Sequence, residues 1–199
     1  RAVERICAMN NDYILTLPSL LDEDYMKKVG KETLTEEWLS IGDVQALRKF
    51  TDTVTIDVES DPYLKSIRDT YPKLESYIKL LKMDKGQWPT HVDTQRSCAI
   101  NIPIQNCDET KVTQMGKKGK LVKSIVTTFG NVEAEWHSHQ YVQYVADAVV
   151  DFEFALQGPT LFNTKIPHGV INYTDTQRVI ATWSYDDDFD NAKQDFLNG

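Results

Sequence analysis

The spacing of apolar residues changes partway along the chain, at about Tyr77. Before that point apolar residues recur at helical intervals, most clearly after Asp61-Pro62, where Leu64, Ile67 and Tyr71 fall on one face. Aspartate followed by proline is a typical helix start. Three further stretches share this helical character: Ser19–Met26, Thr35–Leu39 and Asp43–Phe50. The pattern therefore predicts a helical cover over residues 1–76.

From Tyr77 onward apolar and polar residues alternate. The segment Arg96–Ile104 is the clearest case, because its isoleucines fall on one face and Asn101 falls on the other. Further short strands are predicted at Tyr77–Met83, Leu121–Phe129, Val132–His139, Asp151–Leu156, Thr160–Asn163, Gly169–Tyr173 and Arg178–Tyr185. Residues Tyr141–Val149 fit either a short helix or an irregular segment. Many short strands separated by turns are typical of a sandwich or a jelly-roll barrel, here over residues 77–185.

Composition narrows the class of protein. The 199 residues suit a single domain, which ends in an acidic tail over residues 186–199. Lys and Arg number 22 and Asp and Glu number 30, a net charge of −8 that argues against a nucleic-acid partner. No apolar run is long enough to span a bilayer, so no membrane partner is expected. Three cysteines, Cys7, Cys98 and Cys107, without paired metal spacing fit a reducing, cytoplasmic compartment.

The first chemical signal is His91-Val92-Asp93. In an extended segment, two residues that are two apart point the same way. An imidazole nitrogen and a carboxylate oxygen can then contact one metal ion. Alone the pattern is weak, because a loop histidine beside a solvated aspartate gives the same letters.

A second histidine, His168, lies at the start of a late predicted strand. Two histidines and one carboxylate on one face of an octahedral metal form the facial triad of non-haem Fe(II) oxygenases, which leaves three positions open. Thiolate ligands would instead indicate zinc, and no cysteine stands near these residues in the sequence.

The third signal is Arg178, ten residues after His168 across the turn Thr174–Gln177. The strands holding His168 and Arg178 are expected to be hairpin neighbours, which places Arg178 near the metal but too far to bind it. A guanidinium there can hold the distal carboxylate of a dicarboxylic keto acid bidentately. Alone, Arg178 would fit a surface strand. The His-x-Asp pair, the later histidine and the arginine ten residues after it are much less expected to occur together by chance.

Other polar residues near these motifs are open to two interpretations. Asn101 could bond the keto acid or a backbone group. Arg96 could bind a carboxylate or balance the acidic surface. Asn172 shares a strand face with His168 and could support it from behind. Trp88 could form the lip of the pocket or belong to the core.

His137 and His139 form a rival metal pair, because two histidines on one face of a strand can bind zinc or iron. No third ligand stands at a suitable spacing nearby. A place at the substrate mouth or an exposed strand end is the preferred interpretation. Cys98 is expected to be a small buried residue and Cys107 a loop thiol.

These motifs resemble the 2-oxoglutarate- and Fe(II)-dependent dioxygenases, and most closely the prolyl-4-hydroxylase-like and aspartyl-hydroxylase-like branches, including small phage and marine bacterial members. The residues that carry the resemblance are His91-x-Asp93, Pro167-His168 and Arg178, within roughly Tyr77–Tyr185. The resemblance implies a mainly β fold, a double-stranded β-helix (cupin-like jelly roll) with N-terminal covering helices.

The resemblance also implies the chemistry. His91, Asp93 and His168 would bind Fe(II), and Arg178 would bind the C5 carboxylate of 2-oxoglutarate, with Asn101 as a further candidate contact. The co-substrate would be converted to succinate and CO2 while a C–H bond of the substrate is hydroxylated, with ascorbate as a possible reductant. One departure is that Val179-Ile180 follows Arg178 in place of an Arg-x-Ser pattern, so a hydroxyl must come from elsewhere; Thr182 shares the strand parity of Arg178.

Two alternatives stay open. One is a non-catalytic cupin-like protein that holds a metal or a small acid, and the other is a metal enzyme without a keto acid, which would leave Arg178 unexplained. The substrate is expected to be a small molecule or a peptidyl residue. A second copy of the chain, in a homodimer, is a further partner considered.

Overall fold

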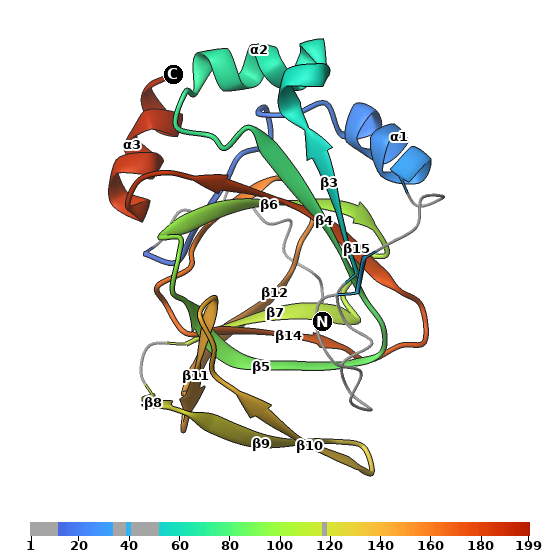
Figure 1. Cartoon of the computed structure of the whole chain (residues 1–199), viewed down its shortest axis with the longest axis vertical. Helices are drawn as coiled ribbons and strands as arrows, with labels where there is room; N and C mark the ends of the chain where they lie inside the picture. The colour runs from blue at the N-terminus through green and yellow to red at the C-terminus, as the bar shows by residue number, and fades with distance from the viewer. Residues whose placement is uncertain (1–11, 34–38, 41–51, 117–118) are drawn as a thin grey trace, which may run out of the picture.

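Two β-sheets face each other and enclose the interior of the molecule (Figure 1). The computed structural model describes residues 12–33, 39–40, 52–116 and 119–199. In order across the larger sheet, the seven strands are β1 (Ile14–Thr16), β13 (Thr160–Asn163), β6 (Cys98–Gln105), β15 (Arg178–Tyr185), β4 (Tyr77–Met83), β3 (Asp52–Asp57) and β2 (Leu39–Ser40). The smaller sheet has six, β12 (Val150–Ala155), β7 (Lys111–Gly116), β14 (His168–Asn172), β5 (Gly86–Asp93), β11 (Val142–Ala146) and β8 (Lys120–Val122).

The order of the strands identifies the fold. Along the chain β4, β5, β6 and β7 alternate between the two sheets, and β12, β13, β14 and β15 alternate again. Four adjacent strands of the larger sheet, β13, β6, β15 and β4, therefore alternate along the chain with four adjacent strands of the smaller sheet, β12, β7, β14 and β5. This is a double-stranded β-helix, and it confirms the predicted fold class. Between β7 and β12 the chain adds β8, β11 and a separate hairpin of β9 (Ser124–Phe129) and β10 (Val132–His137).

Three helices cover the outer face of the seven-stranded sheet: α1 (Glu23–Thr33), α2 (Pro62–Thr70) and α3 (Phe189–Asn198) (Figure 1). A short 3₁₀ turn, Val58–Ser60, precedes α2. The helices bury apolar side chains in one cluster with the outward-facing residues of β6 and β15, among them Met26, Leu64, Ile100 and Trp183. Burial of this apolar surface is what fixes the helices to the sheet.

A second apolar cluster lies between the two sheets. It contains Ile14, Phe162 and Ile180 from the larger sheet and Met115 and Phe154 from the smaller one. A third cluster joins Trp136 of the β9–β10 hairpin to Tyr144 of β11 and to Met83 of β4. The interior is therefore apolar on the β12 and β13 side, and on the β11 side it is lined by aromatic residues.

The prediction for residues 1–76 was only partly right. Asp61 caps α2 by accepting hydrogen bonds from the backbone N–H groups of Tyr63 and Leu64, as the Asp61-Pro62 signal indicates. However, Ile14–Thr16, Leu39–Ser40 and Asp52–Asp57 are strands, and they extend the larger sheet at both edges. The predicted helix Asp43–Phe50, most of Thr35–Leu39 and Cys7 lie outside the described residues.

Several strand predictions after Tyr77 need correction as well. Tyr141–Val149 contains strand β11, and Leu121–Phe129 divides into β8 and β9. Strands β5 and β7 flank β14, although neither shows an apolar–polar alternation in the sequence. The acidic tail forms α3, which buries Phe189 and Ala192. Within the described part of the chain, no helix is long and apolar enough to cross a membrane.

The cap of α2 can be tested by removing its carboxylate. Asp61 also accepts a hydrogen bond from the hydroxyl of Tyr25, so it ties α2 to α1. Asp61→Ala is expected to lower the free energy of unfolding by about 1–2 kcal/mol, the usual cost of losing an aspartate cap. Urea unfolding measures this, with Asp69→Ala on the exposed face of the same helix as the control. Equal stability of the two variants would contradict the assigned cap.

Candidate metal centre

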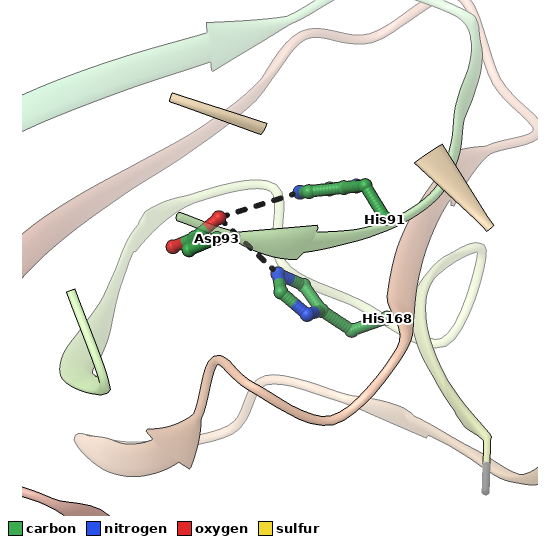
Figure 2. Close-up of side chains that lie close together, drawn as sticks. All are labelled: His91, Asp93 and His168. Carbon is green, nitrogen blue, oxygen red and sulfur yellow. Dashed lines mark ion pairs between the residues drawn. The ribbon is translucent and has the colours of Figure 1, made fainter. Parts of the chain in front are cut away.

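His91, Asp93 and His168 gather at one point of the six-stranded sheet (Figure 2). His91 and Asp93 come from the end of β5, and His168 begins β14, where it pairs directly with His91. Oδ1 of Asp93 lies 3.7 Å from Nε2 of His91 and 3.9 Å from Nε2 of His168. Ligand atoms about 2.1 Å from one ion can be at most about 4.2 Å apart, so both separations suit a shared metal.

The backbone orients both imidazole rings. Nδ1 of His91 lies 2.8 Å from the carbonyl oxygen of Pro89, and Nδ1 of His168 lies 2.8 Å from that of Ile166. A carbonyl oxygen only accepts hydrogen bonds, so each Nδ1 carries the proton. Each Nε2 then presents its lone pair toward Asp93, which is the arrangement a metal ligand needs.

Burial sets the charges of this cluster. Burial, together with the neighbouring His168, lowers the pKa of His91 to about 3, so this imidazole is neutral. Burial alone would raise the pKa of Asp93, but the charge and the hydrogen bond of the Arg96 guanidinium hold that pKa below its usual value. His91 is thus a neutral imidazole and Asp93 a carboxylate, the protonation states in which these groups bind metals.

Arg96 holds the other oxygen of the Asp93 carboxylate. Its Nε donates to Oδ2 of Asp93 at 2.5 Å, and its Nη1 donates to Oγ1 of Thr182 on β15 at 3.0 Å. Of the two roles considered for Arg96, contact with a carboxylate is therefore the one observed. Thr182 is engaged by Arg96, and this corrects the expectation that its hydroxyl would stand beside Arg178.

Arg178 reaches the site from the opposite sheet. It begins β15, which pairs with β4 and β6, so the expected hairpin pairing with the strand of His168 is wrong. The side chain crosses the interior, and its Nη2 lies 3.3 Å from Oγ1 of Thr113 on β7. Arg178 and Thr113 are each 3% exposed. The thiol of Cys107 also contacts the guanidinium, and burial raises the pKa of that thiol.

The strand register places Arg178 one step deeper than the ligand cluster. His168 pairs with Met115, and two residues along the same two strands Val170 pairs with Thr113, the contact of Arg178. Two residues of a strand span roughly 6.7 Å. A five-carbon dicarboxylate that reaches from the metal position to the guanidinium has a length of this order.

Two buried donors near the cluster have no acceptor. Nε of Arg178 and Nε1 of Trp88 are both buried without a hydrogen-bond partner. Trp88 stacks on the ring of His91, with centroids 5.4 Å apart, and pairs with Val170 at the level of Thr113. Trp88 therefore lies beside His91 and also packs in the aromatic cluster, while its place at the lip of a pocket stays a prediction.

Asn172 does not lie beside His168, although the two share a strand. It is four residues away, roughly 13 Å along β14. Its amide nitrogen donates to the carbonyl oxygens of Met83 and Thr176, and its oxygen accepts from Thr174. Asn172 therefore organises the turn between β14 and β15, and its predicted support of His168 is wrong.

The rival pair His137 and His139 does not form a cluster with any other ligand among the described residues. The His137 side chain is 64% exposed, and its nearest acid, Glu135, is 4.0 Å away. Nδ1 of His139 accepts a hydrogen bond from the backbone of Tyr141. Cys98 is fully buried, as expected, and Cys107 is half-buried beside Arg178.

Sequence reasoning missed Thr113 and two residues of the turn before His168. Oγ1 of Thr164 donates to the carbonyl oxygen of Arg96, and Nζ of Lys165 donates to the carbonyl oxygen of Asp93 at 2.9 Å. These bonds fasten the turn of one ligand strand to the turn of the other. No sequence signal indicates them, because each joins segments about 70 residues apart.

No protein-family model matches the chain, and no curated protein matches it. Among solved structures, it is similar to a non-haem α-ketoglutarate-dependent epimerase, SnoN from nogalamycin biosynthesis (15% identity, TM-score 0.46, 87% of this chain and 78% of that one). A prolyl-4-hydroxylase of Pseudomonas putida (13%, TM-score 0.43, 87% and 93%) is also similar, as is an oxalate decarboxylase of Bacillus subtilis (11%, TM-score 0.38, 78% and 29%). At these values function has to be inferred from the site itself.

The role of Arg96 predicts a loss of metal affinity when it is removed. In Arg96→Leu the Asp93 carboxylate loses the group that fixes Oδ2, and metal affinity is expected to fall about 10- to 100-fold. Titration calorimetry with Mn(II) or Co(II) measures this, with Arg68→Leu on α2 as the control. Unchanged affinity in Arg96→Leu would contradict the assigned contact.

The neutral state of His91 predicts a pH dependence of stability. In the unfolded chain His91 gains a proton near its ordinary pKa of 6.5, whereas in the folded protein it resists protonation down to about 3. The unfolded state therefore binds more protons in this window, and it gains in relative stability as pH falls. Because of His91, the free energy of unfolding of the metal-free protein should fall by about 1.4 kcal/mol for each unit by which the pH is lowered.

Urea unfolding of the metal-free protein between about pH 7 and 5 checks this expectation. The variant His91→Gln cannot gain that proton, so its stability should decline less steeply with falling pH. An identical decline in the wild type and the variant would show that His91 is not held neutral.

Proposed function

We propose that the protein is a 2-oxoglutarate-dependent non-haem Fe(II) dioxygenase that hydroxylates a C–H bond. The observation that carries the proposal is Arg178, a buried guanidinium that crosses from the facing sheet and stands one strand step below the cluster of His91, Asp93 and His168. A buried cation is costly without an anionic partner. Among the described residues, the polar groups that contact this guanidinium are the hydroxyl of Thr113 and the thiol of Cys107, neither of which is an anion at neutral pH.

The donor set fits iron. Two neutral imidazoles and one carboxylate are the ligands of the facial triad, which leaves three positions of an octahedral ion for other molecules. The fixed Nδ1 hydrogen bonds present both Nε2 atoms to the same side. Arg96 occupies Oδ2 of Asp93, so that carboxylate would bind through Oδ1 alone. This preserves the open positions, because a bidentate carboxylate would take one of them.

The remaining donors fit the co-substrate. Arg178 would hold the C5 carboxylate of 2-oxoglutarate, and Thr113 would supply the hydroxyl for which the sequence offered no candidate. The unpartnered N–H groups of Arg178 and Trp88 are both donors, as an acceptor-rich dianion requires. When bound, Fe(II) and 2-oxoglutarate would supply the oxidising chemistry together with O2: one oxygen atom would enter succinate as CO2 is lost, and the other would convert the substrate C–H bond to C–OH. The side chains hold the two reactants in place, and Trp88 and Tyr144 flank His91 and limit the access of water.

Two other functions are less well supported. A metal enzyme without a keto acid would leave Arg178 buried with no anion. A non-catalytic cupin-like protein would have no need for three ligands and an oriented pair of imidazoles. It would also have no need for a guanidinium one dicarboxylate length away from the metal position. A metal enzyme without a keto acid predicts that 2-oxoglutarate does not bind in a metal-dependent way, and a non-catalytic protein predicts that no succinate forms in air.

The decisive experiment measures 2-oxoglutarate binding under anaerobic conditions. The Fe(II)-loaded protein should bind 2-oxoglutarate with a visible charge-transfer band, and Arg178→Leu should weaken binding about 10- to 100-fold, the value of a charged hydrogen-bonded pair. Arg68→Leu is the matched control. Binding that is absent in the wild type, or equally strong in Arg178→Leu, would refute the proposal. In air with ascorbate, His91→Ala and Asp93→Ala should form no succinate while keeping the far-ultraviolet dichroism of the wild type.

A further inference from the structure

A row of uncharged polar side chains crosses the seven-stranded sheet. Thr16 pairs with Thr160, Thr160 pairs with Asn101, and Asn101 pairs with Thr182. Directly paired residues share one face of a sheet, so these four side chains, the polar row, lie side by side across β1, β13, β6 and β15.

The polar row faces the interior, opposite the smaller sheet. The residues next to it along each strand, such as Leu15, Leu161 and Ile100, belong to the cluster that packs on the helices. Residues two positions away, Ile14, Phe162 and Ile180, pack instead against Met115 and Phe154 of the smaller sheet. Since strand side chains alternate between faces, the polar row points into the same space.

The polar row also adjoins the metal centre. Thr182 accepts a hydrogen bond from Arg96, and Arg96 in turn holds the metal-ligand candidate Asp93. Thr182 is four residues along β15 from Arg178, roughly 13 Å. A five-carbon co-substrate anchored at Arg178 would therefore end short of the level of the polar row.

The unpartnered polar atoms of the interior fall into two groups, hydrogen-bond donors near Arg178 and oxygen atoms in the polar row. Arg178 and Trp88 offer donors, whereas the two unpartnered atoms in the polar row are oxygens, Oγ1 of Thr16 and Oδ1 of Asn101. Oδ1 of Asn101 can only accept a hydrogen bond, and buried acceptors without donors cost free energy. The polar row contains no charged side chain, and Arg96 beside it is already paired with Asp93. It therefore suits a neutral group that brings O–H or N–H donors.

We propose that the polar row is the substrate-binding wall of the site, and that the substrate presents a neutral group rich in O–H or N–H donors to Asn101 and its neighbours. This inference rests on the proposed function and names the chemistry of its substrate. Polyols and amides share the required donors, and the experiment separates them.

The first arm measures stability without any ligand. Asn101→Leu and Thr16→Val remove an unpartnered buried oxygen, so each should raise Tm by about 2–4 °C. Thr160→Val is the matched control, because the Thr160 hydroxyl already donates to the carbonyl oxygen of Gly158 at 2.9 Å, and losing that bond should not raise Tm. A lower Tm in Asn101→Leu would show that this amide serves the fold, and would overturn the proposal.

The second arm measures binding to protein loaded with Zn(II) and 2-oxoglutarate, which cannot turn over. The probes are methyl glycosides, N-acetyl amino-acid methylamides and, for comparison, simple monocarboxylates. One neutral class should bind saturably and at least about tenfold more weakly to Asn101→Leu, while exposed Thr55→Val on β3 binds as the wild type does. Binding by the carboxylates alone, or by neither neutral class, would overturn the proposal.

The affinity for 2-oxoglutarate separates this proposal from the assigned function. In Asn101→Leu that affinity should stay within about twofold of the wild type. A loss as large as in Arg178→Leu would assign the polar row to the co-substrate and overturn the inference. Failure of the wild type to bind 2-oxoglutarate would refute the dioxygenase function, whereas the Tm comparison tests the polar row without it.

Discussion

The carboxylate of Asp93 is the point on which the rest of the site depends. Its Oδ1 faces both imidazoles, and its Oδ2 is held by Arg96, which reaches the opposite sheet at Thr182. Its backbone N–H donates to the carbonyl oxygen of Thr164 in the turn before His168. One residue therefore joins both sheets and both ligand strands. A charge buried among so many partners has a single arrangement, and this rigidity is what a metal site requires.

The sequence predicted the strands that are apolar on both faces, and those in which apolar and polar residues alternate clearly. Strands β4, β13 and β15 fall at their expected positions, and the Asp61 cap starts α2. It failed for β5 and β7, which hold the site. The inward positions of β7 are Lys111, Thr113 and Met115, and those of β5 include His91 and Asp93. Where function replaces apolar residues on the inner face, the hydrophobic pattern of a strand disappears.

Two of the three candidate ligands could be expected from local spacing, because His91 and Asp93 share a strand face, whereas His168 lies on another strand and was expected from the family resemblance. The partners of Arg178 could not. Thr113 lies on the other sheet, 65 residues away, and only the alternation of strands between sheets brings the two together. The same holds for the polar row, whose members come from four strands and meet only through register. Non-local pairing is the kind of contact that periodicity within one segment does not encode.

The charges of the interior indicate how its ligands would enter. Asp93 and Arg96 neutralise each other, both Nε2 atoms belong to imidazoles that donate through Nδ1, and Arg178 adds one positive charge inside a protein with a net charge of −8. A metal dication alone would raise the buried charge to an unfavourable level, because charges repel strongly away from water. A dianionic co-substrate alone would lack the metal that chelates its other end. Together the dication and the dianion cancel, so each should bind more tightly when the other is present, a coupling that has to be equal in both directions.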